Sequence, residues 1–248
     1  MERMTGSQKP QAISLTAVKR ALSEPRLAAY LRHPDEPLRA VLGRYRWNLA
    51  LCMSLYPALG LLEVALRNNL HRALTDLHGT SAWYNSTSAF LTERGQKSVR
   101  EAKEKLQDQN KPEDPDRLVA ELTFGFWASF LSRDYERHLW PKLLIPAFPL
   151  MPKKDRTRSK VADRLKRIRW LRNRISHHEP IYRLEKPMEL YDDLLEAISW
   201  LAPALLHMLP VGENFGDIYA RGSVAYEIQN EGSELATQAP VQMSELRS

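Results

Sequence analysis

The sequence predicts an all-α protein, folded as a helical bundle. Apolar side chains recur at intervals of three and four residues along most of the chain, as on helices that bury one face. No segment shows the alternation of apolar and polar residues that is typical of a strand. Only 10 of the 248 residues are glycine, whereas leucine, alanine and arginine are frequent, and this composition favours helix. The length suffices for one well-packed domain or two small ones.

The first part of the chain is predicted to form three helices. A serine or threonine near the start can cap a short helix over 14–31. After a loop at 33–37, a helix is expected over 38–56. Pro57 then starts or kinks another helix over 57–77, because proline is accepted in the first turn of a helix but disrupts its interior.

The middle of the chain is predicted to hold two more helices around a proline-containing break. A strongly charged amphipathic helix is expected over 92–109, a break over 110–116 and a further helix over 117–133. The aromatic residues of that further helix occur at helical spacing, so we expect them in the core rather than in a base-stacking platform. They are Phe124, Phe126, Trp127 and Phe130.

The last helices are predicted after a segment with four prolines, 140–152, which we expect to be an irregular connection. Apolar periodicity returns over 158–178 and again over 187–208. It stops beyond Pro210, as expected for a segment without its own core.

Charge separates the parts of the chain. Residues 1–12 are predicted to be a disordered lead-in and residues 13–210 the helical domain. Residues 211–248 carry six acids and two bases, a charge of −4, so we expect an acidic, disordered tail. The formal net charge of the whole chain is +6, so residues 1–210 carry +10. Residues 153–174 alone hold eleven bases and two acids.

Clustered positive charge of this kind attracts polyanions and indicates a nucleic-acid surface. The alternative is a solvated helix face, which is the ordinary explanation of a charge run. The side chains that we expect to contact RNA are Lys153, Lys154, Arg156, Arg158, Lys160, Arg164, Lys166, Arg167, Arg169 and Arg174.

Arg172 is the first candidate for a functional residue. On a helix it falls within the apolar stripe of residues 161, 165, 168 and 175, where a solvated arginine does not belong. A guanidinium there must be paired or must face a cleft, because an unpaired buried charge is very costly. The alternative is therefore a structural ion pair, with Glu179 two turns later or with Glu63 from another helix.

His177 is the second candidate, because an arginine to hold a phosphate and a histidine to move a proton suffice for metal-free RNA cleavage. Asn173 lies one turn before it and can orient the imidazole, and His178 is adjacent. His177 and Arg172 are about 140° apart around a straight helix. They could converge if the helix ends near Pro180, or if two copies of the chain meet.

An earlier helix carries a second polar set beside its apolar stripe. Glu63 and Arg67 have the spacing of an i, i+4 ion pair in the favourable orientation, and His71 follows one turn later. These residues could line the same cleft as Arg172. The alternative is a surface salt bridge beside a core face.

Other chemistries fit the sequence less well. A single cysteine, Cys52, excludes an internal disulfide and a cysteine-rich zinc site, and it favours the cytoplasm. His177 and His178 are adjacent, so they cannot bind zinc as an HExxH helix does. We expect no metal and no cofactor. No signal peptide is apparent and no apolar run reaches the length of a membrane span, so no membrane is expected.

Three segments resemble HEPN domains, most closely the Abi-like (abortive infection) family. Residues 172–178 (RNRISHH) fit the Arg-x4-6-His signature, and residues 61–68 (LLEVALRN) and 122–127 (LTFGFW) match in order. The likeness covers roughly 15–209. It implies a HEPN-like fold, a homodimer, and a metal-independent RNase of toxin or anti-phage systems, and it leaves room for an antitoxin or non-coding RNA partner.

Carried over by position, the resemblance makes Arg172 and His177 the catalytic pair, with Asn173 in support and His178 nearby. His177 would act as general base on the ribose 2′-OH or as acid at the leaving 5′-oxygen, and Arg172 would stabilise the transition state. The product would be a 2′,3′-cyclic phosphate. The rival hypothesis is a non-catalytic helical RNA-binding or scaffold protein, in which Arg172 is only a buried ion pair.

Overall fold

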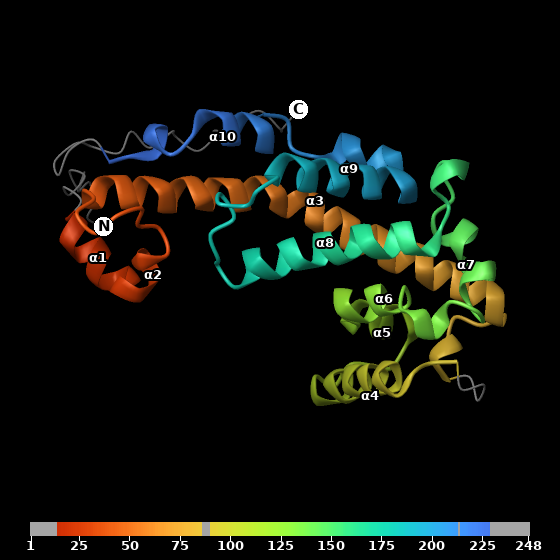
Figure 1. Ribbon diagram of the computed structural model, residues 1–248. Coiled ribbons are helices and arrows are strands. Elements are labelled where there is room, and N and C mark those ends of the chain that lie inside the picture. Colours follow the sequence, from red (N-terminus) through yellow and green to blue (C-terminus); the bar gives the residue numbers. More distant parts are fainter. Residues whose placement is uncertain (1–13, 86–89, 213, 229–248) are drawn as a thin grey trace, which may run out of the picture. The chain divides into compact units, whose positions relative to one another are not determined.

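The structure, a computed structural model, describes residues 14–85, 90–212 and 214–228 and confirms the all-α class. Within these ranges the chain forms α-helices and short 3-10 helices, and no strand (Figure 1). The α-helices are α1 (Leu15–Leu22), α2 (Glu24–Ala28), α3 (Leu38–His78), α4 (Glu93–Asp108), α5 (Pro115–Glu121), α6 (Phe124–Ser129), α7 (Trp140–Ala147), α8 (Arg158–Ser176), α9 (Pro187–Leu201) and α10 (Phe215–Arg221). The 3-10 helices are η1 (Trp83–Asn85), η2 (Arg133–Tyr135), η3 (Lys153–Asp155), η4 (Pro203–Met208) and η5 (Val224–Tyr226).

Contacts divide the chain into two compact units. Among the described residues, the first comprises those up to Leu49 and those from Ala220 onward, and the second comprises those from Ala50 to Tyr219. The boundary falls inside α3, so that helix contributes residues to each unit. All the candidate site residues belong to the second unit.

The first unit is organised around a buried arginine. Arg44 donates a hydrogen bond from Nε to the carbonyl oxygen of Tyr30 at 2.7 Å and forms an ion pair with Glu36. The two charged side chains are only 4% and 7% exposed, so each compensates the other for the loss of water. Asn48 adds a hydrogen bond from Nδ2 to the hydroxyl of Tyr30 at 3.1 Å.

The core of the second unit begins on α3. A row of leucines at helical spacing points inward and is at most 1% exposed: Leu51, Leu55, Leu62, Leu66, Leu70 and Leu74. Asn69 lies in the same helix and donates from Nδ2 to the carbonyl oxygens of Ala147 at 3.1 Å and Leu201 at 3.2 Å. This side chain thus ties α3 to the ends of α7 and α9, because a buried amide needs such partners.

An aromatic cluster around Trp83 forms another part of the core of the second unit. Trp83 is fully buried, and its ring centroid lies between 5.5 and 6.4 Å from those of five neighbours. The neighbours are Tyr84, Phe90, Phe126, Trp127 and Phe130. The prediction that Phe124, Phe126, Trp127 and Phe130 are core residues is therefore confirmed.

Predicted helices have other bounds in the structure at three places. The helix predicted over 14–31 is two, α1 and α2, separated at Ser23, which has a φ of 72°. Pro57 lies inside α3, which continues without interruption, so the predicted pair of helices is one. Burial of leucines on both sides of Pro57 offsets the hydrogen bond that proline removes. The predicted helix over 117–133 is instead two, since Leu122 is extended and Thr123 caps α6 by accepting a hydrogen bond from Phe126 N.

Further differences concern segments that were predicted to be irregular. Residues 140–147 form α7, with Pro141 in its first turn, where a missing N–H costs nothing. α9 ends at Leu201 and continues as η4. Residues 215–221 form α10, with Phe215 only 2% exposed, so disorder does not begin at residue 211. The predicted lead-in and the rest of the predicted tail lie outside the described residues.

α3 is long and apolar enough to cross a membrane by length and composition. Its most apolar stretch of 18 residues has a mean hydropathy of 1.8, and 39% of that stretch is buried inside the protein. The expectation that no apolar run reaches this length is therefore wrong. Core helices of soluble proteins reach the same length and hydropathy.

Candidate functional site

α8 begins and ends with well-defined caps. Thr157 accepts a hydrogen bond from the backbone N–H of Lys160, and the helix ends at Ser176, with His177 as its C-cap residue. His178 follows in the left-handed region at φ 57°. Its N–H donates to Ile175 O at 3.0 Å, and the N–H of Glu179 donates to Arg174 O at 2.9 Å, which is the Schellman arrangement of a helix C-terminus.

Arg172 lies at the edge of the buried face of α8. Residues 161, 165, 168 and 175 are buried as predicted, whereas Arg172 is half-buried. In the described part of the chain, no hydrogen bond or ion pair engages its guanidinium. The alternative, a structural ion pair of Arg172 with Glu179 or Glu63, is not found among those residues. Glu179 pairs with Arg174 at 3.1 Å instead, and no described ion pair joins Glu63 to Arg172.

His177 is exposed and does not approach Arg172 within one chain. Because α8 stays helical through Ser176, the angle of about 140° between the two side chains persists, and the helix end does not turn His177 back. Asn173 is also exposed. The predicted support of the imidazole by Asn173 is not found, since the hydrogen bond described between these residues joins His177 N to Asn173 O in the backbone at 2.9 Å.

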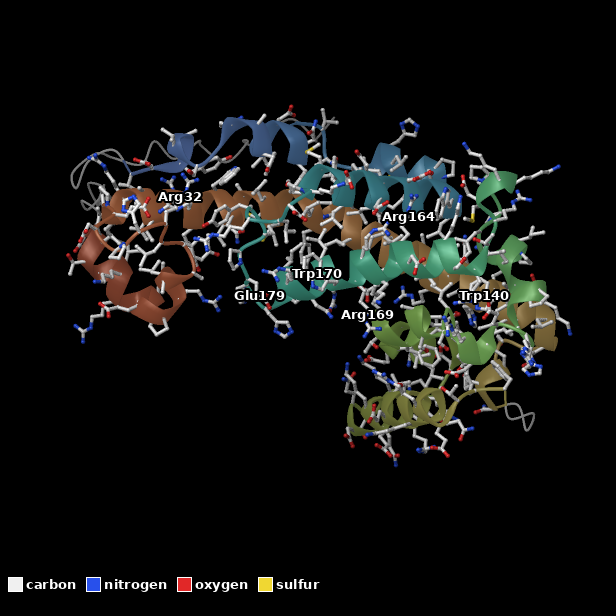
Figure 2. The ribbon with its side chains drawn as sticks, in the orientation of Figure 1. Arg32, Trp140, Arg164, Arg169, Trp170 and Glu179 are labelled. Atoms are coloured by element: carbon white, nitrogen blue, oxygen red, sulfur yellow. The ribbon has the colours of Figure 1, made fainter. Side chains whose placement is uncertain are left out.

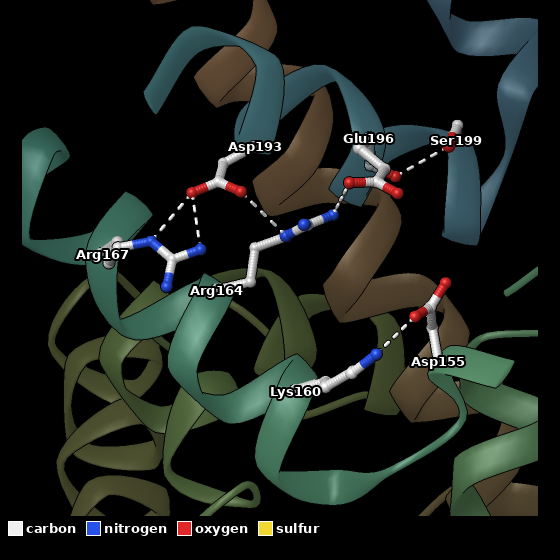
Figure 3. A network of polar contacts seen from close by, with 7 residues as sticks. All are labelled: Asp155, Lys160, Arg164, Arg167, Asp193, Glu196 and Ser199. Carbon is white, nitrogen blue, oxygen red and sulfur yellow. Dashed lines mark hydrogen bonds and ion pairs between the residues drawn. The ribbon is translucent and has the colours of Figure 1, made fainter. Parts of the chain in front are cut away.

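One flank of α8 is neutralised by acids (Figure 3). Arg164 Nε lies 3.0 Å from Asp193 of α9 and its guanidinium also pairs with Glu196. Arg167 lies 2.7 Å from the same Asp193. Nearer the start of α8, Lys160 binds Asp155 at 2.5 Å, and this hydrogen bond lowers the pKa of Asp155.

Three more of the expected RNA-binding cations are engaged elsewhere. Arg156 donates to the carbonyl oxygen of Met151 at 2.7 Å, and Arg158 pairs with Glu136 at 3.0 Å. Arg174 pairs with Glu179 and lies 5.0 Å from the ring centroid of Trp170. Six of the ten side chains that we expect to contact RNA thus already have a partner within the protein, and their contact with RNA stays a prediction. Among the described residues, the members with neither a hydrogen bond nor an ion pair are Lys153, Lys154, Lys166 and Arg169.

The other flank of α8 keeps its charge. Between residues 166 and 177, the side chains that fall within one arc of about 140° around the helix include no acid and are wholly or partly exposed to solvent. We call this part of the helix surface the open arc. Figure 2 shows Arg169 on this flank and Arg164 on the opposite one, which faces α9. The open arc consists of Lys166, Arg169, Arg172, Asn173, Ser176 and His177.

Two residues of the second polar set, Arg67 and His71, have hydrogen-bond partners among the described residues. Arg67 Nε lies 3.4 Å from Asn68 Oδ1, and the predicted ion pair between Glu63 and Arg67 is absent from the described ion pairs. His71 accepts a hydrogen bond at Nδ1 from the Trp83 indole at 2.9 Å. Burial lowers the pKa of His71, against the opposing effect of the Asp116 carboxylate.

Trp170 is a residue that the sequence reasoning missed. It is 46% exposed, although tryptophan is among the residues most strongly driven into cores. It precedes Asn173 by three positions and His177 by seven, so it lies on the same side of α8 as these two. A helical projection of the sequence could have found it, since the apolar stripe of α8 lies on the other side.

Comparison with known proteins finds no matching family model, no matching curated protein and no matching solved structure. Over the described residues, no group of three or more His, Cys, Asp and Glu side chains is placed to hold a metal ion. The likeness to HEPN domains therefore stands on the residues quoted above.

Stability should fall on acidification because of His71. Its folded-state pKa lies below the ordinary value, so its contribution is present above about pH 6.5 and is lost as the pH falls through the folded-state value. Denaturant unfolding of wild type and His71→Gln at pH 7 and pH 5 checks this. We expect a smaller loss between the two pH values in His71→Gln, and an unchanged loss in His138→Gln at an exposed position. An equal loss in all three proteins would contradict this role.

Proposed function

We propose that the chain is a metal-independent endoribonuclease of the Abi-like HEPN type, in which Arg172 and His177 carry the reaction. The observation that supports this best is the half-buried side chain of Arg172, whose guanidinium has no acid partner among the described residues. Every other arginine named above on α8, apart from Arg169, is held by a carboxylate or a carbonyl oxygen. The buried side-chain nitrogens without a hydrogen-bond partner do not include those of Arg172, so water reaches its guanidinium and a ligand can replace that water.

A phosphodiester is the ligand that fits this position. Guanidinium binds phosphate oxygens with two parallel N–H groups, and the open arc around Arg172 carries two further cations and no acid. The two oxygens that Arg172 would hold gain charge as the phosphorane forms, so the arginine would bind the transition state more strongly than the substrate.

His177 supplies the proton transfer in this mechanism. As general base it takes the proton of a ribose 2′-OH, whose oxygen attacks phosphorus while the bond to the 5′-oxygen breaks. The products are a 2′,3′-cyclic phosphate and a 5′-hydroxyl, and the leaving oxygen takes a proton from a second acid. In the reverse assignment, His177 is that acid.

The distance around α8 between Arg172 and His177 requires either a bridging substrate or a second chain. RNA laid across the open arc would touch both ends of it, since Arg169, Asn173 and Ser176 lie between them. A homodimer would instead bring Arg172 of one copy to His177 of the other. Unpaired RNA is the substrate expected here, because its 2′-OH groups are accessible.

The biological role follows from the resemblance. Slow, damaging RNA cleavage in the cytoplasm would serve abortive infection or a toxin system. The second candidate is an RNA-binding or scaffold protein without catalysis. Either non-catalytic role is favoured by the separation of Arg172 from His177 in one chain, and the scaffold in particular by the ion pairs that already occupy many cations of α8.

Cleavage of labelled RNA in EDTA is the first test. We expect wild type to cleave, His177→Ala to lose about 10²–10⁴-fold in rate and Arg172→Ala to lose about 10²–10³-fold. His138→Ala and Arg133→Ala change the same residue types at exposed positions outside the open arc, and they should cleave as wild type does. Full activity of either site variant, or a requirement for metal in wild type, would refute the assignment. Binding without cleavage would support the scaffold.

Substitutions of two lysines of α8 test whether RNA binds along the open arc. Lys166 lies on the open arc, whereas Lys160 is already paired with Asp155 at 2.5 Å. We expect Lys166→Ala to weaken binding of single-stranded RNA and to reduce the slope of log K against log salt by about 0.7, the value for one lost phosphate contact. Lys160→Ala should leave that slope unchanged. Equal slopes for the two variants would place the RNA elsewhere.

A further inference from the structure

Trp170 differs in exposure from the five other tryptophans of the chain. It is 46% exposed, whereas the others are at most 8% exposed. Arg174 lies over part of its indole, 5.0 Å from the ring centroid. A large aromatic surface is thus kept in solvent on a helix whose opposite side is fully packed.

The indole forms one wall of a pocket of about 610 Å³ between α8 and the start of α9. Leu184 and Leu190 add apolar surface, and Glu185 and Asp192 add carboxylates. These two acids have no hydrogen bond or ion pair among the described residues. The other two acids of the pocket are paired with bases: Asp193 with Arg164 and Arg167, and Glu189 with Lys186 at 2.8 Å.

This combination suits an unpaired nucleobase. A base has a flat face that stacks on an aromatic ring, a contact worth about 1–3 kcal/mol for single-stranded RNA, and polar edges that are free only when it is unpaired. A carboxylate only accepts hydrogen bonds, so it selects bases that present N–H groups. Guanine presents an imino and an amino N–H side by side, which one carboxylate can accept together.

The pocket is acidic and the open arc is basic, so a base and the phosphate backbone would bind at different places on α8. The pocket carries four acids against two bases, Arg167 and Lys186, so it disfavours a phosphate. The open arc on the same helix carries cations and no acid. Trp170 and His177 are seven residues apart, about 10.5 Å along the helix axis, within reach of neighbouring nucleotides of one strand.

We propose that this pocket binds an unpaired base of the RNA substrate, with a preference for guanine, and so selects the site of cleavage. The base stacks on Trp170 and donates its N–H groups to Glu185 or Asp192. This inference rests on the proposed function, because it assumes that RNA lies along the open arc.

Acrylamide quenching of tryptophan fluorescence tests it, because Trp170 is the tryptophan that solvent reaches. The protein is the full chain with His177→Ala, which prevents cleavage. Short single-stranded RNAs with one guanine among uridines should protect Trp170 and bind more tightly than all-uridine RNA. Trp170→Leu should raise the Kd for the guanine RNA about 5- to 150-fold, the stacking contribution expressed as affinity. Tyr56→Leu, at another exposed aromatic side chain, should leave it unchanged.

The acids are tested by base preference. The double variant Glu185→Gln with Asp192→Asn should lose the preference for guanine, whereas Glu104→Gln on α4, also exposed, should keep it. Guanosine monophosphate should not protect Trp170 at the concentration at which RNA does. Equal protection would identify a free-nucleotide site and overturn the RNA subsite, as would protection by a basic peptide but not by RNA.

The outcomes separate this inference from the proposed function. If wild type cleaves RNA and Trp170→Leu binds and cleaves as well as wild type, the pocket plays no part and the ribonuclease remains. If nothing is cleaved but guanine RNA still protects Trp170, the pocket stands and catalysis is refuted. If no RNA binds, both are overturned.

Discussion

The carboxylate of Asp193 holds two arginines of α8 against α9, Arg164 at 3.0 Å and Arg167 at 2.7 Å. Glu196 adds a second partner for Arg164. Isolated surface ion pairs contribute little to stability, but networks with ordered geometry contribute more, and the side chain of Asp193 is only 13% exposed. These contacts fix the rotation of α8 about its axis and use the positive charge of one flank. Among the cations of α8, those left without an acid partner are on the open arc, so a stabilising network also limits where along this helix RNA could bind.

Local periodicity predicted the helical class and the core aromatic residues, and residue type predicted the cap of the first helix, which is Ser14. Periodicity failed where burial against distant parts of the chain determines whether a helix continues. α3 continues through Pro57 because leucines on both sides of it are buried. In the site, the helical projection put Arg172 within the apolar stripe, whereas its side chain is only half-buried at the edge of that face. It could not predict that Glu179 pairs with Arg174, because that depends on the left-handed turn at His178. Nor could it predict which cations Asp193 takes, since α8 and α9 are joined by a long connection.

The two proposed catalytic residues have different support. Arg172 is defined by its own environment, a half-buried position without an acid among the described residues. His177 is an exposed C-cap residue, and its role depends on RNA or a second chain to bring it to the reacting phosphate. Trp170 gives the same helix a third feature, an aromatic surface on the side of His177. Together, an arginine for phosphate, a histidine for proton transfer and an indole for a base would account for why one side of α8 is left unpaired.

The most direct test of the central proposal is the fate of a single 2′-hydroxyl. An RNA oligonucleotide should be cleaved by the wild-type chain in EDTA at a defined position and leave a 2′,3′-cyclic phosphate, because the 2′-oxygen is the nucleophile. The same oligonucleotide with one 2′-deoxyribose at that position should resist cleavage there. Cleavage of the deoxy-substituted position at the same rate, or products that end in a 3′-hydroxyl and a 5′-phosphate, would contradict the mechanism assigned to Arg172 and His177.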